Sequence, residues 1–408
     1  MTRKVLNPVV LATSIIIMYT IMPIVSVIIS RYMTTYAYML LAVSLIGFIV
    51  LFGGVHRLRA TVYLLLPFVI YVFCTYVTRR SSLPLWGYQN MLFLLPVIIG
   101  YYFFYYKPEF EKVFSGIIIF ALIVTVITTI IGLIRFPYAA RILATIATSD
   151  DLEAIKYDWN NIGGFDFVYM AVLLYPLFSL AYKLGKIHWA VFLVGSAVLL
   201  TMIILSEYTT ALLLFIVSFA LSLVGRKLTA QRLLILGILA FLAVFFFWGV
   251  FQQLILWLAD TLHSVTLSER LSALAGGVSG VENSESQRIQ FFRTSVEGFI
   301  SSPLFGKLSG SYTISGGHSF ILDSLADYGA LGGAALLFSY RNIYHYFFKP
   351  FRKNNGYGYV LWTFVQAIIL SVINTGMWLA VLTFFAPILL ARIYETNSEG
   401  NYEDSLDS

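Results

Sequence analysis

Charged residues are scarce in this chain of 408 residues, of which only 11% are Asp, Glu, Lys or Arg. A typical soluble protein carries about 25%. Apolar residues make up 59% of the chain, and so few charges cannot cover several soluble domains. The apolar surface is therefore expected to contact lipid. This composition excludes a soluble enzyme fold for nearly the whole chain.

Cysteine, metal-binding motifs and nucleotide-binding motifs are also scarce or absent. The single cysteine, Cys74, lies in an apolar run and cannot form an intrachain disulfide, so it says nothing about the cellular compartment. The sequence has no Gly-rich nucleotide loop. The five histidines are scattered without the spacing of metal ligands. We therefore expect no metal and no cofactor.

Twelve apolar runs are candidates for membrane-spanning helices. A span needs roughly 20 mostly apolar residues, and helices are expected because lipid cannot pair with exposed backbone groups. The sequence therefore predicts an all-α polytopic membrane protein of about 12 transmembrane helices with a large extracytoplasmic loop. The runs cover residues 8–29, 36–53, 61–77, 88–105, 113–134, 165–182, 187–205, 209–224, 233–258, 318–340, 357–373 and 377–393.

The basic residues predict how these helices are oriented. The first run follows Arg3 and Lys4, but it is longer than the apolar region of a secretory signal and lacks a small-residue cleavage site, so we read it as an uncleaved helix. With both termini in the cytoplasm, 16 of the 26 Lys and Arg residues fall on the inside. Short outer loops then hold only Arg31, Arg79 and Arg80. Topology thus explains the basic pI of about 9.1, which gives no case for nucleic-acid binding.

Four parts of the chain follow from this topology. Residues 1–258 hold the first nine transmembrane helices and an outer loop at 136–163, and residues 259–317 form the large extracytoplasmic loop. Residues 318–393 hold the last three helices, and residues 394–408 form an acidic cytoplasmic tail that is expected to be disordered. The two outer loops are the expected place for chemistry.

The large loop contains a short amphipathic helix at 287–300. Apolar residues recur at helical spacing from Ile289 to Phe299, and Arg293 is expected to pair with Glu297 four residues on. Arg288 and Arg293 fall on opposite edges of the apolar stripe, where guanidinium groups can meet phosphates. The alternative is an interfacial helix whose arginines extend to water.

A histidine opens the tenth predicted span. Gly316 and Gly317 precede His318 and let the backbone approach a ligand. In the first turn of a helix, the macrodipole disfavours the charged form of an imidazole, so a neutral His318 is suited to take a proton from a hydroxyl. The alternative is a helix-entry residue that donates to a backbone carbonyl.

Two carboxylates follow on one face of the same helix. Asp323 and Asp327 are four residues apart, and carboxylates at membrane depth usually face a cavity or a partner inside the bundle. We expect a functional role for them, with structural hydrogen bonding as the rival interpretation. Gly329 and Gly333 form a GxxxG pair, which predicts close helix packing.

These residues carry a resemblance to the integral-membrane O-antigen polymerase and ligase family, which includes capsular polysaccharide polymerases. The match consists of Arg288, the Pro-Leu-Phe-Gly run at 303–306, and the stretch from His318 to Asp327 and on to Gly332. Order and spacing agree over about 45 residues of this chain. Two departures are present: Ser319 stands where the family usually has Asn, and residues 206–213 lack the arginine that relatives often carry.

The resemblance implies a site for a lipid-linked sugar. Arg288 would bind the diphosphate of a polyprenyl-linked glycan and His318 would act at the reacting centre. Asp327 matches the acidic position of the family. The departure at 206–213 leaves a second diphosphate arginine to be found, and Arg293 is one candidate. An arginine fork also suits this chemistry on physical grounds, because it neutralises the growing charge of a leaving diphosphate without a metal.

We therefore expect an inverting, metal-independent glycosyltransferase in a bacterial cytoplasmic membrane, with its active site facing outward. It would join polyprenyl-diphosphate-linked oligosaccharides into a polymer such as O-antigen or capsule, with Arg288 and His318 as catalytic residues and Arg293, Asp323 and Asp327 as substrate-binding residues. Its partners would be lipid-linked donor and acceptor and membrane lipid. The scheme also allows a chain-length regulator protein.

Two rivals remain open. One is a ligase of the same family, which transfers the finished glycan to a final acceptor. The other is a polysaccharide flippase or secondary transporter, which should place charged groups in broken helices at mid-membrane and have small outer loops. The 59-residue outer loop at 259–317 favours an enzyme. Residues 156–159 are a candidate sugar path, and an interfacial aromatic cluster is the alternative there.

Overall fold

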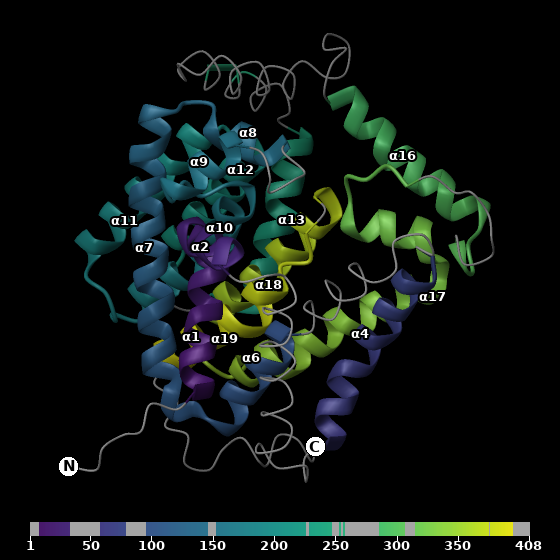
Figure 1. Cartoon of the computed structure of the whole chain (residues 1–408), viewed down its shortest axis with the longest axis horizontal. Helices are drawn as coiled ribbons and strands as arrows, with labels where there is room; N and C mark the ends of the chain where they lie inside the picture. Colours follow the sequence, from purple (N-terminus) through teal and green to yellow (C-terminus); the bar gives the residue numbers. More distant parts are fainter. Residues whose placement is uncertain are drawn as a thin grey trace.

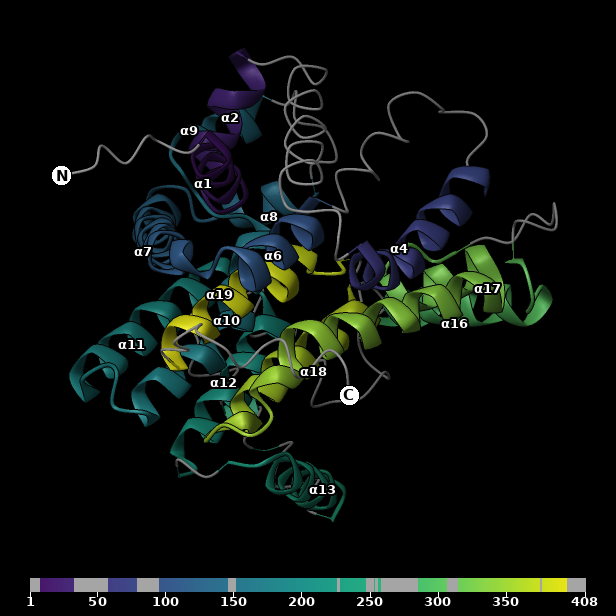
Figure 2. The ribbon, with the colours of Figure 1, turned by 90° about the horizontal axis from the view of Figure 1, so that it is seen from below.

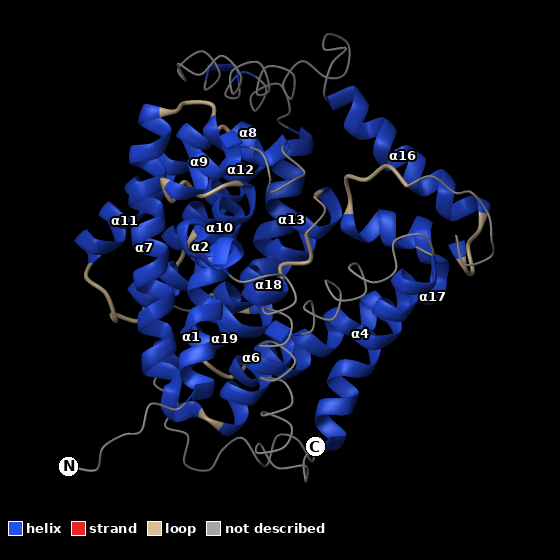
Figure 3. Cartoon of the chain, in the orientation of Figure 1, coloured by secondary structure: helices blue, strands red, loops and turns tan. Residues whose placement is uncertain are grey.

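A computed structural model describes residues 8–32, 58–78, 95–145, 152–225, 228–246, 253, 256–257, 285–306, 315–374 and 376–394. Within these residues the chain is all-α, with fifteen α-helices and no strand (Figure 3). The predicted span 36–53, residues 259–284 and 307–314 of the predicted outer loop, and the acidic tail from residue 395 lie outside the described residues.

Most of the helices overlap the predicted apolar runs, whereas α8, α9 and α16 lie in the two predicted outer loops. The helices are α1 (Pro8–Ile21), α2 (Pro23–Tyr32), α4 (Leu58–Thr78), α6 (Leu95–Tyr106), α7 (Glu111–Arg135), α8 (Ala139–Thr145), α9 (Leu152–Trp159), α10 (Phe165–Lys183), α11 (Trp189–Ser206), α12 (Thr209–Leu223), α13 (Ala230–Phe246), α16 (Glu285–Ser301), α17 (Phe320–Ile343), α18 (Tyr357–Ile373) and α19 (Ala386–Tyr394). A π-helical turn, Val381–Phe385, leads into α19.

Several of these helices can cross a membrane. In the described residues, four helical segments are long and apolar enough: Pro108–Arg135, Phe165–Lys183, Trp189–Ser206 and Phe320–Phe351. The bent pair α1 and α2 would add a fifth, and six further apolar helices are 10–17 residues long. The chain is thus a helical protein with several membrane-spanning helices, and the full number of twelve stays a prediction.

The helices form a main bundle with a smaller group at its side. Helix α10 lies at the centre of the bundle, where it packs against α11, α12, α18 and α19. Helices α4 and α16 each pack against α17 beside the bundle (Figures 1 and 2). The first residue of α17 is tied to the end of α18, because the Phe320 amide donates to the Asn374 carbonyl at 2.9 Å. The side group therefore has a fixed attachment to the bundle.

The first predicted span is broken rather than continuous. The helix direction changes by 117° between α1 and α2, at Met22 and Pro23. Proline cannot donate to the preceding helical turn, and its ring clashes there. The free amide of Ile24 donates to Asn161 Oδ1 at 3.2 Å, so a residue of the outer loop 136–163 pairs with the backbone at the bend.

Helix α17 is also broken, at Gly329. This glycine has φ 62° and ψ −158°, a conformation that is essentially limited to glycine. The break lies against the PLFG turn (residues 303–306): the Ala330 amide donates to the Pro303 carbonyl at 2.7 Å and the Leu331 amide to the Leu304 carbonyl at 3.3 Å. The expected helix packing through Gly329 and Gly333 is therefore wrong for Gly329, which contacts a turn instead of a helix.

The contact at the break is too close for any side chain. A Cβ atom on Gly329 would lie 2.5 Å from the backbone of Leu304 and Phe305. Gly306, with φ 54°, is equally confined, since its Cβ would lie 2.6 Å from the Asp327 carbonyl group. The two glycines thus let the PLFG turn and the break approach each other backbone to backbone.

We predict that Gly329→Ala lowers the free energy of unfolding by about 2 kcal/mol or more, because it adds backbone strain and a steric clash. Thermal melting in detergent measures the effect. Gly237→Ala in α13 is the matched control, since a Cβ there meets nothing within 4 Å and should leave stability unchanged or slightly raised. Equal melting temperatures for Gly329→Ala and the wild type would contradict this account of the break.

Candidate functional site

Helix α16 forms as predicted and presents one narrow face to α17. Ser295 and Gly298 are buried on that face, and Phe291 is half-buried one turn earlier. Small residues at 295 and 298 permit this close packing. The predicted apolar stripe is buried only in part, because Ile289 is 52% exposed and Val296 is 42% exposed, whereas Phe292 and Phe299 are half-buried.

The segment that carries His318 lies directly on this face. The imidazole of His318 stacks on the Phe291 ring, with ring centroids 4.4 Å apart and planes 29° apart. The Gly316 amide donates to Ser295 Oγ at 2.9 Å. A Cβ on Gly316 would lie 2.2 Å from the Phe291 carbonyl oxygen, so only glycine allows this approach. The predicted close approach by glycine is thus made to α16.

Arg288 lies in the first turn of α16, three residues before Phe291. Position 288 lies about one helical turn before Phe291 along α16, and His318 stacks on the Phe291 ring. The side chain of Arg288 is outside the described residues. The juxtaposition of the two predicted catalytic residues therefore stays a prediction.

Asp323 joins α16 to α17. Its Oδ1 accepts a hydrogen bond from Ser295 Oγ at 2.5 Å, and its Oδ2 accepts one from the Ser319 amide at 2.9 Å. One carboxylate thus bonds both to a side chain of α16 and to the backbone just before α17. Hydrogen bonds to a charged carboxylate are stronger than those between neutral groups. Asp323 therefore fixes the segment that carries His318 against α16.

Ser319 is the N-cap of α17. Its Oγ accepts from the Leu322 amide at 3.0 Å, which satisfies one of the free amides of the first turn. Serine thus performs a capping role at the position where the resembled family has Asn. The cap also corrects one expectation: His318 precedes the N-cap and does not lie in the first turn, so the helix dipole acts on it from farther away than predicted.

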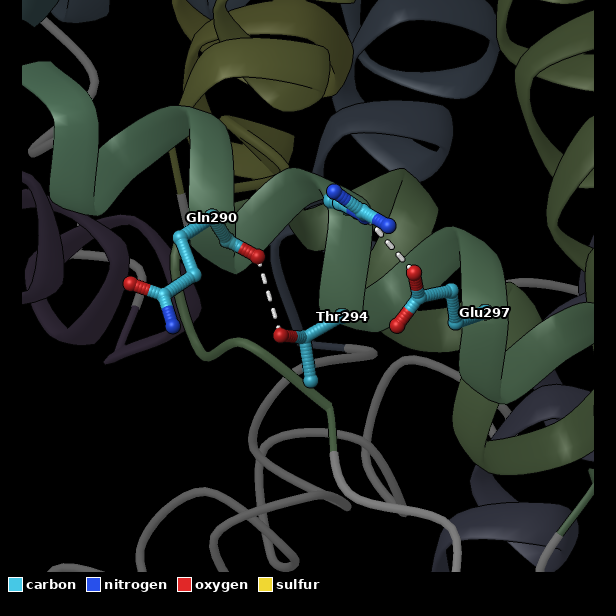
Figure 4. Close-up of polar contacts among 4 residues, drawn as sticks. Gln290, Thr294 and Glu297 are labelled. Atoms are coloured by element: carbon cyan, nitrogen blue, oxygen red, sulfur yellow. Dashed lines mark hydrogen bonds and ion pairs between the residues drawn. The ribbon is translucent and has the colours of Figure 1, made fainter.

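Arg293 lies on the other side of α16. Its Nε is 2.7 Å from Glu297 Oε1, which confirms the predicted pair, and both side chains are exposed. Figure 4 shows Glu297 in this pair, and it also shows Thr294 donating to the Gln290 carbonyl. Positions 293 and 291 differ by about 200° around the helix, so Arg293 faces away from the stacked ring. Substrate binding by Arg293 stays a prediction.

Asp327 lies one turn beyond Asp323, at the level of the break in α17. It is half-buried, and Gly306 of the PLFG turn packs on its backbone. The next residue, Tyr328, contacts Tyr71 of α4, with the two ring centroids 5.6 Å apart. Substrate binding by Asp323 and Asp327 remains untested, and the contacts of Asp323 indicate a positioning role.

The described part of the predicted outer loop 136–163 contains α8 and α9, where α9 packs against α2 and α8 packs against α10 and α7. Tyr157 is buried, and Lys156 Nζ lies 4.6 Å from the centre of the Phe136 ring. Burial raises the pKa of Asp158 to about 6. Asn161 bonds to Thr128 of α7 as well as to Ile24. These contacts are those of a packed loop, and the sugar path proposed for residues 156–159 stays a prediction.

Phe291 and Ser295 are the site residues that sequence reasoning missed. Both lie between the apolar positions that define the predicted stripe. The small residues at 295 and 298 were the feature of the sequence that could have predicted a packed face.

A comparison of the chain with protein-family models finds no match, and a comparison with curated proteins finds none either.

We predict a coupling free energy of about 1.5–3 kcal/mol between Ser295 and Asp323, as expected for a hydrogen bond to a charged group. The measurement is a double-mutant cycle of thermal stability with Ser295→Ala, Asp323→Ala and the double variant. The exposed pair Arg293 and Glu297 on the same helix is the matched control and should couple by only about 0.3–0.5 kcal/mol. Equal coupling in the two pairs would refute the role of Asp323 in joining α16 to α17.

Proposed function

We propose that this protein is an integral-membrane glycosyltransferase that joins polyprenyl-diphosphate-linked oligosaccharides into a polymer such as O-antigen or capsule. The observation that supports it best is the stacking of His318 on Phe291 of α16. A cation for a diphosphate and a base for a hydroxyl are the two groups that this transfer needs, and His318 contacts α16 about one helical turn from position 288.

In the proposed reaction, the donor is a glycan whose C1 carbon is linked to the diphosphate of a lipid. Arg288 binds that diphosphate and stabilises its growing negative charge. The acceptor hydroxyl attacks C1 as the bond from C1 to the diphosphate oxygen breaks, and the configuration at C1 inverts. His318 takes the hydroxyl proton. The imidazole is exposed, which leaves it accessible to an acceptor.

Asp323 serves in this scheme as a positioning residue. It contacts Ser295 and the Ser319 amide, on either side of the His318 segment. The position of a catalytic base strongly affects the reaction rate, because a misplacement of about 1 Å can lower that rate about 100-fold. The site would face the outside of a bacterial cytoplasmic membrane, where a lipid-linked donor makes a nucleotide sugar unnecessary.

One observation favours the transporter as a second candidate. Helices α1 and α2 are bent by 117°, and α17 is broken at Gly329 next to Asp327. Discontinuous helices with polar groups at the break are typical of secondary transporters. The ligase of the resembled family shares the proposed site. Product analysis separates the three: a ladder of repeats for a polymerase, single transfer to a final acceptor for a ligase, and translocation alone for a transporter.

We predict that Arg288→Ala and His318→Ala each reduce polymer formation about 100-fold or more, because each removes a group that acts in the transition state. The assay uses purified protein in detergent with a polyprenyl-diphosphate oligosaccharide, without added metal or nucleotide, and measures the product ladder.

Arg392→Ala in α19 is the control, since it removes an exposed arginine outside the proposed site and should keep most of the activity. Full ladders from a well-folded His318→Ala variant, or equal losses from Arg288→Ala and Arg392→Ala, would remove the proposed assignments. Arg288→Lys keeps the charge and should recover only part of the activity, because a lysine cannot form the bidentate contact.

A further inference from the structure

A groove runs between α4 and the half of α17 that follows the break at Gly329. It has a volume of about 520 Å³ and lies well along α17 from His318. Figure 2 shows α4 beside α17 over this stretch. The walls are apolar and open to the surroundings: Leu66 is 49% exposed, Leu331 is 44% exposed and Phe338 is 52% exposed. In a membrane-spanning segment, such a surface contacts lipid.

The length of the groove fits part of one lipid chain. Its lining extends from Leu331 of α17 to Tyr346 of the π-helical turn Tyr344–Phe348, and on α4 from Tyr63 to Ile70. Seven residues of α4 at 1.5 Å per residue give about 10 Å with two walls, which lies within the depth of about 15 Å of one leaflet in a hydrocarbon core of about 30 Å. The groove can therefore take part of an acyl chain of one leaflet.

One end of the groove is basic and polar. Arg341 and His345 line it there, one helical turn apart, and both are exposed. The Arg341 guanidinium carbon lies 6.0 Å from the centre of the Phe338 ring, so the side chain follows the groove wall. None of the described residues that line the groove is Asp or Glu. The positive-inside count assigns this end to the cytoplasmic side.

A proline fixes the two walls at that end. Pro67 of α4 has no amide proton, so the Tyr63 carbonyl loses the partner that it would have in a regular helix. Asn342 Nδ2 of α17 donates to that carbonyl at 2.7 Å. The bond ties α4 to α17 beside Arg341, which gives the groove a defined mouth rather than a loose gap between helices.

We propose that this groove binds a phospholipid with an anionic headgroup from the cytoplasmic leaflet. Its acyl chain lies between α4 and α17, and its phosphate lies at Arg341 and His345. The charge of the mouth complements an anionic headgroup, and the apolar walls complement a chain. Each Lys or Arg near the surface contributes about 1 kcal/mol to such binding. The proposal is independent of glycosyl transfer, because none of these residues belongs to the site on α16.

The test compares lipid retention by the full chain in nanodiscs that contain equal amounts of phosphatidylglycerol and phosphatidylethanolamine, read by native mass spectrometry. The wild type should retain phosphatidylglycerol preferentially, and Arg341→Gln should lower that preference about fivefold. Arg392→Gln in α19 is the control, because it removes an exposed arginine at the same predicted side that does not line the groove. An equal loss in both variants would show only general charge attraction and would overturn the proposal.

A second variant tests the apolar walls without altering charge. Ala334 lines the groove and is exposed, so Ala334→Trp should block the chain and lower retention with Arg341 intact. Ala220→Trp, at an exposed position of α12, is its control. Millimolar inorganic phosphate should leave retention unchanged. Full displacement by phosphate would identify a site for free anions. Normal retention in Ala334→Trp would show that no lipid chain lies between the walls, and either result would refute binding of a lipid.

Discussion

A backbone group without a partner is costly in a bilayer, where lipid offers no hydrogen bond, and three interruptions of helices in this chain meet that constraint in the same way. The bend between α1 and α2 receives the side chain of Asn161. The proline inside α4 receives the side chain of Asn342. The break in α17 receives the carbonyl groups of the PLFG turn. Asn161 lies 137 residues from Ile24 and Asn342 lies 279 residues from Tyr63, whereas the PLFG turn belongs to the segment before α17. Each interruption therefore also fixes a tertiary contact.

The contact at the α17 break determines where the candidate site lies. The PLFG turn follows α16 directly, so its bonds to α17 hold the end of α16 beside the break. From that anchor the helix runs back along the half of α17 that precedes the break, and its packed face meets the segment before the N-cap. Phe291 and Ser295 then lie opposite His318 and Asp323. The geometry of the site is thus a consequence of backbone pairing several turns away.

Hydropathy predicted the helices well and their interruptions poorly. The span 357–373 coincides with α18, and the run 318–340 begins within two residues of α17. A hydropathy average cannot detect the positive φ of Gly329, because a glycine in an apolar run scores as part of a helix. The sequence analysis singled out both the PLFG run and Gly329 as motifs. Nothing in the sequence indicated that these two motifs contact each other. Contacts between distant segments need the fold.

The packing at the break also bears on the choice between enzyme and transporter. A carrier moves its broken helices during each cycle, so the junction needs room for backbone motion. At Gly329 there is little room, since even a Cβ would lie 2.5 Å from the backbone of the PLFG turn. The half of α17 that precedes the break is held further by Asp323 and by the bond between Tyr71 and Ser324, at 2.8 Å. A junction confined on both sides suits the proposed transferase, which needs a histidine in a fixed position, better than it suits a carrier.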